Sequence, residues 1–174
     1  MRELGKPYHF IVTATTRRQR ESERDGTDYI FKTTEQFRRM IDQEELLEWA
    51  EVYGNLYGVP RSQIAEALST GRDVIVKPDV QGAATIKRLA PDALTIFLAP
   101  PDMDELARRL TARMTESTED LSLRLATAES EMQEADSFDY VVVNRRGNLD
   151  DAVEEIDRIV SKERHRTPPR RVSL

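Results

Sequence analysis

Residues 73–77 read Asp-Val-Ile-Val-Lys and form a short apolar run that does not alternate between apolar and polar positions. A strand with one face in water alternates, whereas continuous Val/Ile-rich runs are typical of strands buried on both faces of a parallel sheet. Three further runs share this pattern, at residues 9–13, 94–98 and 140–144. The four runs therefore predict an α/β fold with a parallel sheet.

Helical stretches separate the last three runs. Asp102 precedes Glu105 by three residues, which is the spacing of a capping pair at the start of a helix. Residues 117–135 carry apolar side chains at helical spacing, and Asn148 is expected to cap a last helix with one apolar stripe. Alternating strands and helices predict a layered α/β core with right-handed crossovers.

Residues 14–70 have a different pattern and predict a small lobe inserted between the first two buried strands. A charged loop is followed by short strands, two helices and a turn at Gly54. The expected elements are a strand at 29–31, a helix capped by Thr33 and Gln36, strands at 45–52 and 55–57, and a helix at 61–69 that ends before Gly71. The basic residues 164–174 are expected to form a frayed tail.

Composition excludes several classes of function. The 174 residues carry 26 basic and 32 acidic side chains, and the net charge of −6 argues against a generally basic nucleic-acid-binding protein. The sequence has no cysteine, which excludes disulfides, thiolate metal sites and cysteine nucleophiles, and its two histidines argue against a histidine-based zinc site. The apolar runs are too short to span a membrane, and the N-terminus has no signal-peptide pattern. We expect a cytoplasmic chain with neither nucleic acid nor a membrane as its partner.

Two groups of arginines are candidates for binding phosphate. Arg17 and Arg20 follow the first buried strand, and ligands bind at the carboxyl ends of parallel strands. Arg109, Arg113 and Arg124 lie on two adjacent predicted helices, with the first two on one helical face. Spacing alone favours a simpler interpretation of both groups, in which the arginines lie on solvated faces. The ion-pair partners of the helical group would then be Glu105, Glu116 or Glu119.

Glu48 stands in a predicted strand that is otherwise rich in apolar residues. A buried carboxylate needs hydrogen-bond donors. Guanine offers two neighbouring donors, the N1–H and the 2-amino group, and adenine does not offer this pair. The alternative is a strand-end glutamate that points to solvent, and the sequence alone does not decide between the two.

Seven motifs in a fixed order resemble guanylate kinases, and the resemblance covers residues 7–163. The motifs are Thr-Thr-Arg-x-x-Arg at 15–20, Asp-Gly-x-Asp-Tyr-x-Phe at 25–31, Leu-Glu-Trp-Ala-Glu-Val-Tyr-Gly-Asn-x-Tyr-Gly at 47–58, Asp-Val-Gln-Gly-Ala at 79–83, Ile-Phe-Leu-Ala-Pro-Pro at 96–101, Arg-Leu-x-x-Arg at 109–113 and Val-Val-Val-Asn at 141–144. The resemblance implies a P-loop-kinase-like core with sheet order 2-3-1-4-5. It also implies Mg²⁺-dependent transfer of the γ-phosphate from ATP to GMP, which gives ADP and GDP.

The resemblance further implies a division of the chain and roles for individual residues. The core would comprise residues 1–13, 71–101 and 137–165, the GMP-binding lobe residues 14–70, the lid residues 102–136 and the basic tail residues 166–174. GMP would contact Thr13, Arg17, Arg20, Tyr29, Glu48, Tyr57 and Val59. Asp79 would lie near Mg²⁺ and the reacting phosphates, and Asn144 would contact ATP. The transferred phosphoryl group would be neutralised by the lid residues Arg109, Arg113 and Arg124.

The largest departure from the family pattern lies at the N-terminus. The sequence contains no G-x-x-G-x-G-K-[ST] phosphate loop, and Met1 aligns inside the helix that would follow this loop. The central strand of the sheet would then be absent, which leaves a slot between the strands at 73–77 and 94–98. We expect either roughly 25–30 further N-terminal residues or closure of the slot, by strand rearrangement or by an element of a second chain in a dimer.

These departures affect the expected activity. Without a phosphate loop the chain as given is expected to be inactive toward ATP, and the alternative function is a catalytically inactive guanylate-kinase-like binding or interaction domain. Val59 stands where the family has a Ser or Thr that donates to the base carbonyl, and Lys77 replaces a carboxylate. Met114 replaces a glycine of the lid, and Arg145–Arg146 replace an Asp pair. A different acceptor nucleotide is a weaker interpretation of Val59 and Lys77.

Overall fold

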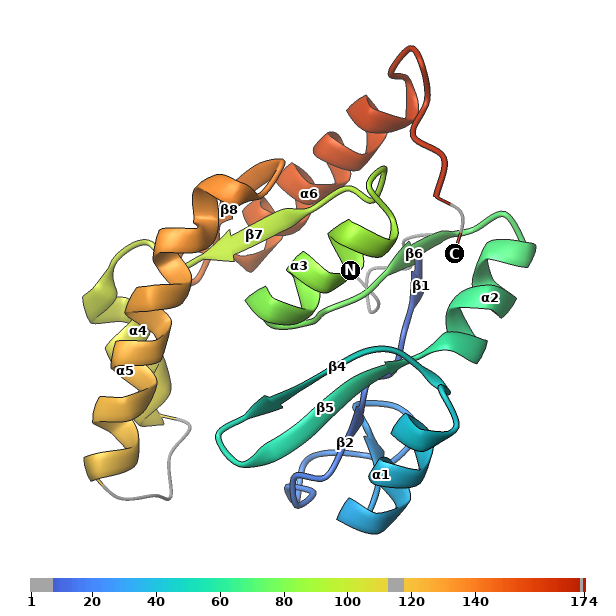
Figure 1. Ribbon diagram of the computed structural model, residues 1–174. Helices are drawn as coiled ribbons and strands as arrows, with labels where there is room; N and C mark the ends of the chain where they lie inside the picture. Colours follow the sequence, from blue (N-terminus) through green and yellow to red (C-terminus); the bar gives the residue numbers. More distant parts are fainter. Residues whose placement is uncertain (1–7, 113–117, 173) are drawn as a thin grey trace. The chain divides into compact units, whose positions relative to one another are not determined.

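The computed structural model describes residues 8–112, 118–172 and 174 (Figure 1). The chain divides into two compact units, the first ending at Pro91 and the second spanning Asp92–Val172. Each unit has its own strands, helices and hydrophobic cluster. The fold is therefore a mixed α/β fold, as the strand and helix patterns predict.

The first unit contains a parallel strand pair, which confirms the predicted parallel pairing. The predicted burial on both faces is wrong, because every residue of β1 and β6 is only partly buried, and Leu98 and Val141 of the second pair are exposed. Strand β1 (Tyr8–Phe10) pairs with β6 (Asp73–Ile75) in parallel, and the amide of Ile11 continues the ladder by donating to the carbonyl of Ile75 at 3.0 Å. Helix α2 (Arg61–Ser69) packs against β6. The parallel pairing brings the ends of β1 and β6 to the same edge of the sheet.

The inserted lobe of the first unit is built on a four-stranded sheet with the order β3-β2-β5-β4. Its strands are β2 (Ala14–Thr15), β3 (Ile30–Phe31), β4 (Leu46–Val52) and β5 (Asn55–Pro60). Strands β4 and β5 form an antiparallel hairpin that turns through Tyr53 and Gly54, both with positive φ (50° and 71°). The predicted turn at Gly54 is confirmed, because only a residue that tolerates the left-handed region closes this turn without strain.

Helix α1 (Thr34–Asp42) begins at the predicted capping box. Thr33 Oγ1 accepts from the amide of Gln36 at 3.2 Å, and Gln36 Oε1 accepts from the amide of Thr33 at 2.9 Å. The helix buries Phe37 completely in a cluster with Ala14 and Leu46. The capping box thus fixes the start of a helix whose single large apolar side chain ties it to the lobe's sheet.

Helix α3 (Val80–Leu89) follows β6 and packs beside β4 in the first unit. A second hydrophobic cluster, which contains Ile11, Leu47, Val59 and Ile64, joins the end of β1 to the hairpin and to α2. Gln63 of α2 replaces a strand partner beyond β1, because its side chain accepts from the amide of Val12 at 2.9 Å and donates to the carbonyl of Val12 at 3.0 Å. These contacts hold the lobe on the parallel pair.

The second unit contains the other predicted parallel pair, β7 (Ile96–Ala99) with β8 (Tyr140–Val143). Its helices are α4 (Met103–Ala112), α5 (Thr118–Gln133), the short 3₁₀ helix η1 (Glu134–Ser137) and α6 (Leu149–Arg164). Buried Val142 packs with the α6 residues Ala152 and Ile159. The two parallel pairs belong to separate sheets, and neither gains a third strand in the described part of the chain.

One of the two predicted caps of this unit is confirmed and the other is wrong. Asp102 Oδ1 accepts from the amide of Glu105 at 2.7 Å, as expected for the start of α4. Asn148 does occupy the N-cap position of α6, but its side chain accepts no backbone hydrogen bond there. Its Nδ2 instead donates to Asp151 Oδ2 in the first turn at 3.1 Å.

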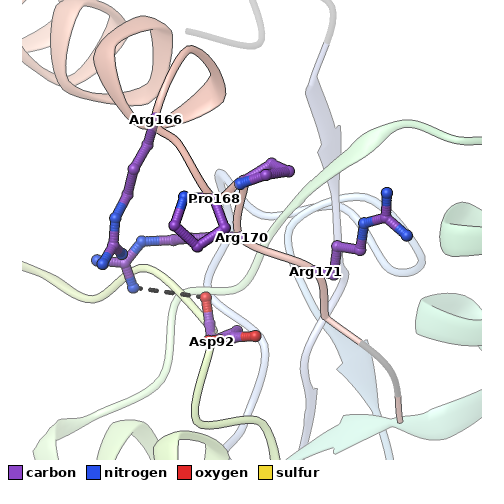
Figure 2. Close-up of a pocket in the computed structure, with 6 residues that line it drawn as sticks. Asp92, Arg166, Pro168, Arg170 and Arg171 are labelled. Carbon is purple, nitrogen blue, oxygen red and sulfur yellow. Dashed lines mark hydrogen bonds between the residues drawn. The ribbon is translucent and has the colours of Figure 1, made fainter.

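The expectation of a frayed basic tail is also wrong for the described residues after α6. Arg170 Nε donates to Glu163 Oε2 at 2.6 Å, and Arg170 Nη2 lies 3.4 Å from Asp139 Oδ1. Its guanidinium also donates to the carbonyl of Asp92 at 3.4 Å, as the dashed line in Figure 2 shows. Two carboxylates of the same unit therefore hold the tail. A cavity of about 430 Å³ is lined by Asp92 and by the tail residues Arg166, Pro168, Pro169, Arg170 and Arg171.

Among the described residues, no helix combines the length and the apolar character needed to cross a bilayer.

Candidate functional site

The loop after β2 and the neighbouring strand β5 hold a cluster of charged and aromatic side chains, which we name the Tyr29 cluster. It comprises Arg17, Arg20, Glu23 and Tyr29 of the loop and Tyr57 of β5. The loop turns where Thr15 Oγ1 accepts from the amide of Arg17 at 3.1 Å. The Arg17 guanidinium then lies 5.3 Å from the centroid of the Tyr29 ring, and the centroid of the Tyr57 ring lies 6.2 Å from the same point, with the two rings edge to face. The sequence-predicted phosphate residues of the lobe are thus brought together.

Glu23 holds both arginines of the Tyr29 cluster. Its Oε1 lies 2.6 Å from Arg17 Nη2 and 3.7 Å from Arg20 Nη1, and its Oε2 accepts from the amide of Arg20 at 2.9 Å. Burial alone would raise the pKa of Glu23, but the hydrogen bonds from Arg17 and from the Arg20 amide, with the charges of both arginines, lower it. Glu23 therefore stays ionised and orients Arg17, while the Arg20 side chain keeps 53% of its surface exposed.

The Tyr29 cluster has an excess of positive charge. Two guanidinium groups share one carboxylate, and the phenol of Tyr57 also interacts with Arg17. Planar guanidinium groups with parallel N–H donors match phosphate oxygens, and phenolic O–H groups add further donors. The arrangement suits a phosphate group. The alternative of arginines on a solvated face fits Arg20, whose side chain is exposed, but not Arg17, whose side chain is largely buried.

A second feature of the first unit is the buried carboxylate of Glu48 on β4, which is only 7% exposed. The solvent-exposed alternative for this residue is therefore wrong. Glu48 Oε2 lies against Gly82 of α3, where a Cβ atom would stand 2.7 Å from this oxygen. Asp79, the N-cap of α3, accepts from the Gly82 amide at 2.7 Å. Two carboxylates thus meet at the start of one helix.

The Glu48 residue is buried as a whole, but its carboxylate oxygens keep some contact with solvent, because no fully buried side-chain oxygen of the described residues lacks a hydrogen-bond partner. No hydrogen bond from any described residue reaches its side chain, while burial, with the nearby charge of Asp79 as a smaller cause, raises its pKa to about 7. An ionised carboxylate in such a place is stabilised only when donors are supplied. Glu48 is therefore poised to bind a ligand that carries adjacent N–H groups.

Gly82 is a site residue that the sequence analysis does not single out. Any side chain at this position would collide with the Glu48 carboxylate and with Pro78, whose Cβ would be 2.9 Å from the added atom. The Asp-Val-Gln-Gly-Ala motif contains the signal, since a glycine in the first turn of a helix is costly unless something packs against it. Only the three-dimensional neighbour reveals that this something is Glu48.

Two other predicted GMP contacts lie deeper in the first unit. Thr13 is buried, and its carbonyl accepts from the amide of Ile30 at 2.9 Å. Val59 has no exposed surface and packs with Ile11 and Leu47. Val59 therefore acts as a core residue here and presents no surface to a ligand.

In the second unit, Arg109 of α4 bridges to the loop after β8. Its Nε donates to Glu105 Oε1 at 2.7 Å, and its Nη2 donates to the carbonyl of Asn144 at 2.8 Å. Hydrogen bonds from Arg108 and Arg109 lower the pKa of Glu105 to about 2. The ion-pair interpretation of Arg109 with Glu105 is confirmed, and the bridge to Asn144 could not be read from spacing.

The bridge borders an open, basic depression in the second unit. The depression has a volume of about 350 Å³ and is lined by Glu105, Arg108, Arg109, Asn144, Arg145, Arg146, Gly147 and Leu149. Four arginines around one carboxylate favour an anionic ligand. Arg124 lies on α5, which packs beside α4. Arg113, Met114 and Glu116 lie outside the described residues, and the side chain of Glu119 is not described either.

The fold is that of an α/β protein with clusters of arginine side chains in the loop after β2 and beside the loop after β8. A family model described as guanylate kinase matches residues 1–163, and the chain belongs to the guanylate kinase family, a family of nucleoside monophosphate kinases. The resemblance of the seven motifs is thereby confirmed.

Individual relatives carry the same description. Guanylate kinase 2, chloroplastic/mitochondrial, of Oryza sativa subsp. japonica is 42% identical over 175 residues and matches 100% of this chain, which spans 61% of that relative's length. The guanylate kinase of Dechloromonas aromatica is 44% identical over 142 residues, which cover 82% of this chain and 70% of the relative. The crystal structure of guanylate kinase from Anaplasma phagocytophilum superposes with a TM-score of 0.82 at 32% identity, and covers 95% of this chain and 81% of its own.

The raised pKa of Glu48 gives a prediction for folding stability. An unfolded glutamate has a pKa near 4.5, so between pH 4.5 and about 7 the folded chain binds more protons and its free energy of unfolding falls as the pH rises. Glu48→Gln imitates the protonated form. We expect this variant to match the parent chain at pH 4.5 and to be more stable by about 1–3 kcal/mol at pH 8.

Urea unfolding measures the free energy of unfolding at pH 4.5 and at pH 8. The fluorescence of Trp49, the single tryptophan, follows unfolding of the first unit. Glu51→Gln is the matched control, because Glu51 is exposed on the same strand. A stability difference of equal size at both pH values would contradict the assignment of the raised pKa to Glu48.

Proposed function

We propose that this chain forms the GMP-binding and phosphoryl-acceptor part of a guanylate kinase, which transfers the γ-phosphate of ATP to GMP and yields ADP and GDP. The observation that carries the proposal is the buried Glu48 carboxylate, which receives no hydrogen bond from the described residues. A cationic cluster in the same unit supports it. One end of the ligand would thus need N–H donors and the other end negative charge, as in GMP.

Glu48 would recognise the guanine edge. The N1–H and the 2-amino group of guanine would each donate to one carboxylate oxygen, which requires the ionised form. Hydrogen bonds to a charged group contribute about 1.5–3 kcal/mol each. Adenine presents an acceptor at N1, which would face the carboxylate without a proton between them, so the same group that favours GMP disfavours AMP.

The Tyr29 cluster would hold the phosphate of GMP. Arg17, fixed by Glu23, would present its guanidinium, the exposed Arg20 would close on the phosphate from solvent, and Tyr29 and Tyr57 would donate their hydroxyl protons. Thr13 would contribute from the adjoining strand end. Val59 would give the base no donor because its side chain has none, and we expect weaker binding of the guanine carbonyl than with the Ser or Thr of the family.

The lid arginines would stabilise charge on the transferred group. Phosphoryl transfer needs positioning and charge neutralisation rather than covalent chemistry by the protein. Arg109 now binds Glu105 and the Asn144 carbonyl, so it would have to leave these partners or reach the phosphates from this position. Arg113 and Arg124 would act from the same lid, residues 102–136, and its closure would exclude water.

Asp79 suits the Mg²⁺ that accompanies ATP. Mg²⁺ is usually bound by one or two carboxylates together with water and substrate phosphates. Asp79 has one oxygen fixed by the Gly82 amide, and we propose that its carboxylate acts on the ion through water. Bound Mg²⁺ would neutralise charge on the nucleotide phosphates. Asn144 and the basic depression around it are the proposed ATP-side residues of the second unit.

The alternative of an inactive interaction domain is not favoured, because the matched relatives carry the name guanylate kinase and the arginines of both proposed sites are retained. The division into core (1–13, 71–101 and 137–165), GMP-binding lobe (14–70), lid (102–136) and tail (166–174) remains part of the proposal.

Calorimetric titration of GMP tests the acceptor site. We expect the parent chain to bind GMP, and Glu48→Ala and Arg20→Ala to abolish measurable binding, since one removes the base contact and the other a phosphate contact. Glu51→Ala and Arg24→Ala are matched controls on the same strand and loop, with exposed side chains. Binding that survives both site substitutions would discard these roles.

A coupled assay of ADP release in the presence of GMP tests the transfer step. The 174 residues contain no glycine-rich phosphate loop, so we expect the chain as given to turn over ATP negligibly even at saturating GMP. Turnover in the range of about 1–100 s⁻¹, ordinary for kinases, would refute this expectation and would require another phosphate-binding element.

A further inference from the structure

Lys77 extends the Tyr29 cluster from a different part of the first unit. It lies two residues after the end of β6 and 48 residues after Tyr29, and its Nζ lies 3.4 Å from the Tyr29 hydroxyl and 5.6 Å from the centroid of the Tyr29 ring. Arg17, from the loop after β2, lies 5.3 Å from the same ring. Two cations from separate elements therefore contact one tyrosine.

Charge balance around Tyr29 is incomplete. Arg17 and Arg20 share the carboxylate of Glu23, whereas Lys77 forms no ion pair with any described carboxylate. Three cations thus have one carboxylate among them. Cations that gather around one tyrosine repel one another, and a bound anion reduces this repulsion.

The hydrogen bond to Tyr29 has a direction. An ammonium group has donors only, so Lys77 Nζ donates and the Tyr29 oxygen accepts. The phenolic proton of Tyr29 is then free to donate elsewhere, toward an acceptor such as a phosphate oxygen. Lys77 itself is exposed and keeps two further N–H groups for the same anion.

We propose that Lys77 is an additional phosphate-binding residue of the acceptor site, which binds the phosphate monoester of the nucleotide together with Arg17 and the hydroxyl of Tyr29. The proposal rests on the proposed function and deepens it. Because family resemblance leads one to expect a carboxylate at this position, the added cation is a property of this chain. It would compensate for the base contact that Val59 does not supply, by shifting recognition toward the phosphate.

The competing explanation is structural, with Lys77 stabilising the lobe through its contact with the Tyr29 ring. Calorimetric titrations of GMP and of guanosine, which lacks the phosphate, separate the two explanations. We expect Lys77→Gln to weaken GMP binding about tenfold, to leave guanosine binding unchanged and to reduce the salt dependence of GMP binding. Lys77→Arg should restore most of the GMP affinity.

Lys162→Gln is the matched control, because Lys162 Nζ lies 5.3 Å from the ring of Tyr140 in the second unit and so makes the same kind of contact without a cationic partner of the Tyr29 cluster. Equal losses of GMP and guanosine binding in Lys77→Gln would overturn the proposal in favour of a structural role. An unchanged GMP affinity would overturn it as well.

A failure of the proposed function gives a different result. If the parent chain binds neither GMP nor guanosine, the GMP assignment fails, and titration with inorganic phosphate then tests Lys77 by itself. Phosphate binding that Lys77→Gln weakens and Lys77→Arg retains would support the anion site, whereas absent or unaltered phosphate binding would overturn it.

Discussion

The buried carboxylate of Glu48 is the constraint on which the acceptor site depends. It fills the space that a side chain at Gly82, at the start of α3, would occupy, and it is close enough to Asp79 for the second charge to oppose its ionisation. A glutamate in this position costs folding free energy when it ionises, and it receives no donor from the described chain in return. A ligand that donates hydrogen bonds to this carboxylate would offset that cost.

The Tyr29 cluster differs from Glu48, because its carboxylate is supplied with hydrogen-bond donors. Glu23 is a carboxylate with several donors, so it stays ionised and fixes Arg17 within the Tyr29 cluster. The cations of the cluster outnumber their acidic partners, and a phosphate would supply the missing charge. Within the first unit, the Glu48 carboxylate receives no hydrogen bond from the described residues, and the cations of the Tyr29 cluster outnumber their acidic partners. The two features together fit a ligand with N–H groups at one end and a phosphate at the other.

Much of the fold could be predicted because its signals are local. The unbroken apolar runs predict the parallel pairs β1–β6 and β7–β8, and Thr33 with Gln36 predicts the start of α1 through a bond that spans three residues. Contacts between distant residues could not be predicted this way. The tail is held by Arg170 through carboxylates that spacing does not connect to it, and the side chain of Asn148 donates to Asp151 and caps no backbone group.

The candidate site shows the same division. The resemblance to guanylate kinases points to Arg17, Tyr29, Tyr57 and Glu48, and the structure places the first three around one ring. The resemblance cannot show that Gly82 makes room for Glu48, since this depends on the packing of α3 beside β4. Nor does a motif reveal that Val59 is fully buried.

The most direct test of the central claim compares the affinities of GMP, IMP and AMP for the parent chain by calorimetry at pH 8, where Glu48 is ionised. GMP offers the Glu48 carboxylate two donors, the N1–H and the 2-amino group. IMP has the N1–H but lacks the 2-amino group, and AMP presents an acceptor at N1. The account predicts that IMP binds about tenfold more weakly than GMP and AMP more weakly still. Equal affinities for all three nucleotides would contradict it.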